Sequence, residues 1–76
     1  MKSLYRILSD VLEIDEQTIT EKTSPENVAN WDSFNALILV SELETNFQVK
    51  FSMGDVSSVK NVGDIKETLK KYNINV

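Results

Sequence analysis

The stretch WDSFNALILVSELETNF, residues 31–47, decides the fold of this chain. It begins with an acid, Asp32, that can cap a helix, and Ser33 follows directly. At about 100° per residue, one side of the helix collects Ala36, Leu39, Val40, Leu43 and Phe47, with Leu37 at its edge. We interpret this side as the core face of a helix that ends near Phe47 or Gln48.

A second apolar strip lies on another side of the same helix. Phe34 and Ile38 stand in one row with Ser41 and Thr45, at helical spacing, and the row begins beside Ser33. A serine at a helix start next to an apolar strip suggests a docking surface around an attachment point. The alternative is that a neighbouring loop covers Phe34 and Ile38 as part of the core.

The segment before residue 31 predicts one helix and a long connection. Ser3 can cap a helix over residues 3–13, whose apolar stripe comprises Leu4, Ile7, Leu8, Val11 and Leu12. Residues 14–32 then connect to the next helix, with Ile14, Ile19 and Val28 as anchors to the core. Ser24-Pro25 favours a single helical turn in this connection. Trp31, before the cap, closes the loop over the core.

The segment after residue 47 predicts two more helices. Gln48–Phe51 alternates polar and apolar residues but has no partner strand, so we expect an extended loop. Residues 53–59 predict a short helix with a Ser52 cap and with Met53, Val56 and Val59 on one face. Residues 62–72 predict an amphipathic helix, in which Asn61 and Asp64 resemble a capping box. The predicted fold is therefore all-α, a small four-helix bundle forming a single domain over residues 1–76.

The composition excludes most catalytic and metal chemistry. The 76 residues contain no histidine and no cysteine. This removes His-based acid–base catalysis, the Ser-His-Asp arrangement, thiolate sites and most zinc sites. We therefore expect no enzyme working alone, no catalytic residue and no metal site.

The charge is negative overall and unevenly distributed. The formal net charge is −4, and residues 7–49 hold nine acids against one base, Lys22. Acids on the central helix disfavour nucleic acid and favour a basic or mixed protein partner. No apolar run approaches the length of a membrane span, and no targeting segment is evident. We expect a cytoplasmic monomer.

The pattern resembles the acyl carrier protein family over nearly the whole chain. Its most specific part is TSPENVANWDSF, residues 23–34, followed by the Leu-Glu and Phe of LETNFQVKF, residues 43–51. The resemblance implies a bundle of the acyl-carrier type with a long loop between helices 1 and 2. It implies that a phosphopantetheinyl transferase attaches 4′-phosphopantetheine to Ser33, and that the thiol of this arm carries an acyl group as a thioester. The matching acid, Asp32, would assist the transferase, by helping to hold its metal ion.

Two positions depart from the family pattern. Phe34 stands where leucine is usual, and Ile38 stands where carriers of fatty-acid synthases often have an acid. These departures suggest a free-standing carrier for one pathway, served by an acyl-loading ligase and by downstream acyl-transfer or synthase enzymes. The expected partner surface is the outer strip with its neighbouring acid, namely Phe34, Ile38, Ser41, Glu42 and Thr45.

Two alternatives stay open at this point. An aminoacyl or peptidyl carrier would use the same arm with a different cargo. An unmodified helical protein-interaction module would use the Phe34–Ile38 strip for binding without any arm.

Overall fold

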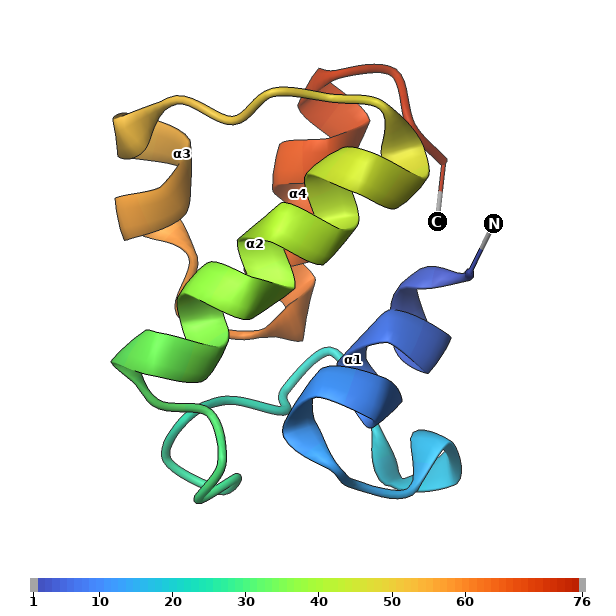
Figure 1. Cartoon of the computed structure of the whole chain (residues 1–76), viewed down its shortest axis with the longest axis vertical. Helices are drawn as coiled ribbons and strands as arrows, with labels where there is room; N and C mark the ends of the chain where they lie inside the picture. Colours follow the sequence, from blue (N-terminus) through green and yellow to red (C-terminus); the bar gives the residue numbers. More distant parts are fainter. Residues whose placement is uncertain (1, 76) are drawn as a thin grey trace.

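The computed structural model describes residues 2–75, which form four α-helices, one short 3₁₀ helix and no strand (Figure 1). The elements are α1 (Leu4–Leu12), η1 (Glu16–Thr18), α2 (Ser33–Phe47), α3 (Met53–Ser58) and α4 (Val62–Lys71). The all-α prediction, the long loop between the first two helices and the short third helix are confirmed. Every helix in this part of the chain is too short or too polar to span a bilayer.

Each α-helix begins at the polar cap that its sequence predicts. The side chains of Ser3, Asp32, Ser52 and Asn61 each accept a hydrogen bond from the backbone N–H three residues later. The full capping box, however, belongs to α3, where Ser52 and Asp55 bond to each other's backbone. The box predicted for α4 is only half formed, because the Asp64 carboxylate accepts from Lys60 N–H, one residue too early.

The core lies where α1, α2 and α4 meet. Fully buried side chains come from α1 and α4 and comprise Ile7, Leu8, Leu12, Val62 and Leu69. Helix α2 contributes Leu39 and Leu43, each 3% exposed, while Ala36, Val40 and Phe47 are half-buried. The predicted core face of α2 is therefore correct at Leu39 and Leu43 and partly open at the other three positions.

The loop between α1 and α2 is anchored as predicted and is also tied to α4. Ile19 and Val28 are buried, and Ile14 is half-buried against the core. The N–H groups of Val62 and Gly63, at the start of α4, donate to carbonyl groups of this loop at 2.9 Å each. A Cβ atom on Gly63 would lie 3.3 Å from the Glu21 carbonyl oxygen, so glycine permits this close approach.

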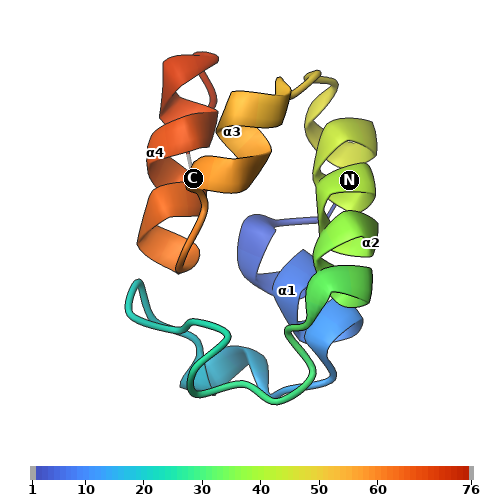
Figure 2. The same ribbon diagram turned by 90° about the vertical axis from the view of Figure 1, so that its left-hand side faces the viewer.

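Helix α3 lies between α2 and α4 on one side of the molecule (Figure 2). Val56 and Val59 are half-buried there, but Met53 is 86% exposed. The prediction that Met53 shares the buried face is wrong. Helical spacing places the three residues on one side of α3, but only Val56 and Val59 line the cavity between α2, α3 and α4, whereas Met53 at the start of the helix does not.

Candidate functional site

The start of α2 presents a capped helix end with free N–H groups. The Asp32 carboxylate accepts from Asn35 N–H at 2.8 Å, and the Asp32 carbonyl accepts from Ala36 N–H at 2.8 Å. The first N–H groups of a helix have no intrahelical partner, which leaves those of Ser33 and Phe34 available at this end. The predicted cap is confirmed.

Two asparagines that the sequence analysis did not single out fix this helix start in place. The Asn30 side-chain amide donates to the Leu12 carbonyl oxygen at 2.9 Å, which ties the loop to the end of α1. The Asn35 side chain in turn donates to the Asn30 carbonyl oxygen at 2.7 Å. These bonds hold Ser33 at a defined place relative to α1. The bond between Asn30 and Leu12 joins residues 18 positions apart, so no local sequence pattern predicts it.

Ser33 is the first residue of α2, and it is exposed. Its hydroxyl therefore stands beside backbone N–H groups at the positive end of a 15-residue helix. Anionic groups such as phosphate esters are favoured at such a position. The neighbouring Asp32 carboxylate accepts from the Asn35 N–H, so it serves as a cap and not as part of an anion cradle.

The outer strip of α2 is exposed, as the docking interpretation requires. Phe34 is 71% exposed and Ile38 is 39% exposed, and Ser41 and Thr45 of the same row are also exposed. Glu42 is half-buried beside them. Within residues 2–75, no loop covers Phe34 and Ile38 as part of the core, so that alternative is wrong.

The exposed apolar surface is wider than the predicted row. Leu37, placed by the helical wheel at the edge of the core face, is 66% exposed and adjoins Phe34 and Ile38 on α2. Leu37 therefore belongs to the outer surface of α2 and contributes nothing to the buried core. Phe34, Leu37 and Ile38 are called the α2 apolar patch below.

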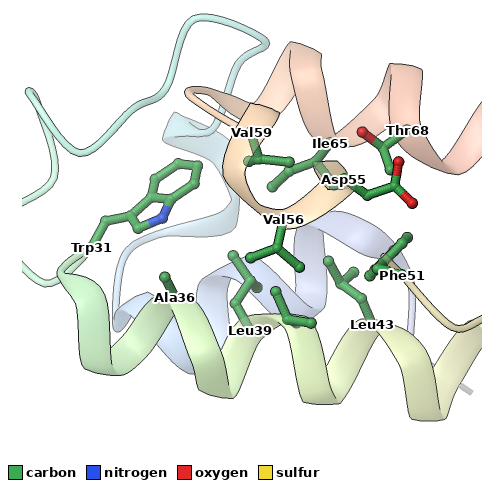
Figure 3. Close-up of a pocket in the computed structure, with 11 residues that line it drawn as sticks. Trp31, Ala36, Leu39, Leu43, Phe51, Asp55, Val56, Val59, Ile65 and Thr68 are labelled. Atoms are coloured by element: carbon green, nitrogen blue, oxygen red, sulfur yellow. The ribbon is translucent and has the colours of Figure 1, made fainter. Parts of the chain in front are cut away.

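An apolar cavity of about 60 Å³ lies on the opposite side of α2, under α3 (Figure 3). Its walls are the aliphatic side chains of α2, α3 and α4, with Trp31 at the end nearest Ser33 and with Asp55 and Phe51 at the other end. Trp31 is 6% exposed, which confirms that it closes the loop over the core. Val56 of α3 and Val59, the C-cap residue after α3, line this cavity.

The family described as phosphopantetheine attachment site matches residues 2–69. The chain belongs to this family. It is 32% identical over 65 residues to the acyl carrier protein of Thermotoga maritima, covering 86% of this chain and 80% of that protein. It is 27% identical over 66 residues to the acyl carrier protein of Lactobacillus acidophilus, covering 87% and 82%.

The fold comparison agrees with the sequence comparison. A solved structure assigned to an acyl carrier protein of Mycobacterium tuberculosis superposes on this carrier with a TM-score of 0.81 and 25% identity, covering 91% of this chain and 92% of that chain. The resemblance to acyl carrier proteins and the acyl-carrier fold are thereby confirmed. Proteins of this family carry acyl groups and do not catalyse reactions, so this chain is a carrier and not an enzyme.

The cofactor of the family is covalent phosphopantetheine, and the residues at the start of α2 suit it. The carrier presents there an exposed serine hydroxyl, backbone N–H groups without intrahelical partners, and a helix dipole that favours negative charge. Ser33 is exposed among the described residues, so a phosphodiester on its hydroxyl would extend into solvent. The site therefore fits an attached phosphate ester.

Proposed function

We propose that Ser33 receives the phosphopantetheine arm and that this carrier serves the enzymes of one dedicated pathway. The observation that carries the assignment is the position of Ser33, exposed at the first turn of α2 directly after the Asp32 cap. When attached, the arm supplies a thiol that holds an acyl group as a thioester.

The residues around Ser33 have separate roles in this proposal. Asp32 orders the first turn, so that the Ser33 hydroxyl is held out toward a transferase, and its charge lies where the transferase's metal ion can reach it. Asn30 and Asn35 hold the helix start against the end of α1. The free N–H groups of the first turn stabilise the negative charge of the phosphodiester once it has formed.

The partner surface that we propose extends from Ser33 along the outer strip of α2. It comprises Phe34, Ile38, Ser41, Glu42 and Thr45, and we add Leu37 because it is exposed beside them. Three kinds of partner enzyme would each contact this surface. They are a phosphopantetheinyl transferase, which acts on Ser33, and an acyl-loading ligase and a downstream acyl-transfer or synthase enzyme, which act on the arm. The apolar centre of this surface supports a docking role, because a few buried side chains near the centre often dominate the energy of an interface.

The assignment of Ser33 is tested by intact mass. The purified chain is incubated with coenzyme A and a broad-specificity phosphopantetheinyl transferase, and its mass is measured before and after. We expect an increase of one phosphopantetheine, which Ser33→Ala abolishes and the control variant Ser57→Ala keeps, because Ser57 is an exposed serine of α3 outside the proposed partner surface.

Two outcomes would contradict the assignment. A mass increase that persists in Ser33→Ala would place the arm on another residue. No increase in the wild-type chain, with a transferase that modifies a second carrier in the same assay, would favour the unmodified interaction module.

A further inference from the structure

Asp55 of α3 is a buried acid that connects two helices. Its side chain lines the cavity, and the residue is only 5% exposed. One carboxylate oxygen accepts from the Lys71 ammonium group at 2.6 Å. The other accepts from the Tyr72 hydroxyl and from the Ser52 backbone N–H, the latter at 3.0 Å. Asp55 therefore joins the start of α3 to the end of α4.

Helix α3 has little else to hold it in position. Six residues are too few for a helix that persists alone, since isolated helices shorter than about 12–15 residues are marginal in water. The apolar contribution of α3 and its C-cap to the interior is limited to Val56 and Val59, both half-buried, and the one buried residue of α3 is the charged Asp55. Hydrogen bonds to charged groups are about twice as strong as neutral ones, so the Asp55 contacts carry an unusual share of its attachment.

The end of α4 is itself fixed against the linker before α3. The Tyr72 ring packs edge-on against Phe51, with ring centroids 5.8 Å apart. The Phe51 N–H donates to the Glu44 carboxylate of α2 at 2.8 Å. The Tyr72 ring is therefore held by Phe51, which is itself bonded to α2, and this fixes the Tyr72 hydroxyl that donates to Asp55.

We propose that Asp55, Lys71 and Tyr72 form a clamp that keeps α3 closed over the cavity. Releasing the clamp opens the cavity, while the packing of α1, α2 and α4 persists, because the fully buried core residues belong to α1 and α4. Asp55 is thus a positioning residue for the cavity wall. The inference concerns the unmodified chain, so it holds or fails independently of which residue receives the arm.

The single tryptophan of the chain provides the test. Trp31 lines the cavity at the end opposite Asp55, so its accessibility reports α3 displacement and not a local change at the clamp (Figure 3). Quenching of Trp31 fluorescence by acrylamide is measured for wild type, Tyr72→Phe and Lys71→Gln. Tyr72→Phe keeps the ring contact with Phe51 and removes only the hydroxyl. We expect the quenching constant to rise at least about twofold in both variants, with helical circular dichroism retained, because local opening precedes global unfolding.

Lys70→Gln is the matched control, since Lys70 is an exposed lysine of the same turn that makes no contact with Asp55. It should leave the quenching constant at the wild-type value. Unchanged quenching in both clamp variants would overturn the proposal, and so would an equal rise in Lys70→Gln.

A second measurement covers the case in which a clamp variant loses its fold. Amide hydrogen exchange of the wild-type chain should show Val56–Ser58 opening at least about tenfold more often than Ile7 and Leu8 of α1. Equal opening of α3 and α1 would mean that α3 never moves alone, and would overturn the proposal.

Discussion

Asp32 and Asp55 show that aspartate has two different structural roles in this carrier. Both accept backbone N–H groups at the start of a helix. Asp32 remains exposed beside Ser33, whereas Asp55 is buried and also accepts from Lys71 and Tyr72. Their different surroundings separate a cap at the proposed attachment site from a contact that closes the cavity.

The contacts among Asp55, Lys71 and Tyr72 should make the stability of the folded chain depend on pH. The hydrogen bond from Lys71, then those from Tyr72 and the Ser52 backbone, hold the pKa of the Asp55 carboxyl well below its ordinary 3.8. The hydrogen bond to Asp55 raises the pKa of Tyr72 above its ordinary 10.0, and likewise raises that of Lys71 above 10.5. The stabilisation is therefore complete between about pH 4 and pH 10. It is lost as the pH falls through the folded-state pKa of Asp55 or rises through those of Tyr72 and Lys71.

We expect Lys71→Gln to raise the pKa of the Asp55 carboxyl, because Lys71 is the largest cause of its depression. Carbon-detected NMR titration of the Asp55 carboxyl checks this, with Lys70→Gln as the variant that leaves the titration in place. An Asp55 titration that is the same in wild type and Lys71→Gln would contradict the ion pair.

At the scale of the element, α2 works with two apolar faces. Leu39 and Leu43 pack into the core, while Phe34, Leu37 and Ile38 remain exposed on the other side. A helix that is apolar on both sides is ordinarily buried, so the exposed second face supports the proposed docking surface. In this carrier that face begins at Ser33.

Ile38→Glu tests the exposed face of α2. We expect the melting temperature to stay nearly unchanged, because substitutions at exposed positions usually shift stability by under about 0.5 kcal/mol. Transfer of the arm or of an acyl group by the cognate partner enzyme should slow sharply, because a charge would enter the apolar centre of the interface. Rates are measured with the wild-type chain under the same conditions.

Gln17→Glu is the control for charge alone, since Gln17 is exposed in η1, within the loop between α1 and α2. It should leave the transfer rate at the wild-type value. Full activity of Ile38→Glu with the cognate enzymes would show that the α2 apolar patch is not their docking surface.

At the scale of the whole molecule, stability depends on a small core shared by α1, α2 and α4. Domains of this size unfold with about 5–15 kcal/mol. One buried leucine is therefore a large fraction of the total. Phe47, at the end of the core face, is half-buried, so it contributes less than a fully buried phenylalanine would.

Leu43→Ala and Leu37→Ala measure this core with the same substitution on the same helix. Leu43 is 3% exposed, and its loss should cost about 2–5 kcal/mol of the free energy of unfolding. Leu37 is 66% exposed, and its loss should cost under about 0.5 kcal/mol. Urea denaturation followed by circular dichroism gives both values. Similar costs for the two variants would mean that the core face of α2 is misplaced.

The sequence by itself determined which segments form α-helices, where they begin and which family the chain resembles, but not the 3₁₀ helix η1. Caps such as Ser3, Asp32 and Ser52 act on N–H groups three residues away, and helical spacing shows in the order of apolar residues. These are local effects, so a single chain suffices to predict them. The Asp32–Ser33 pair was found in the same way, from its place at the start of α2.

Only the tertiary structure decided what covers each face and which distant polar groups meet. Leu37 and Met53 carry the same apolar character as their buried neighbours, and their exposure depends on whether another segment lies over them. Asn30 with Leu12, and Asp55 with Lys71 and Tyr72, meet because the chain brings together residues 16–18 positions apart. Helical spacing describes one element at a time, whereas burial and these contacts arise from how several elements pack.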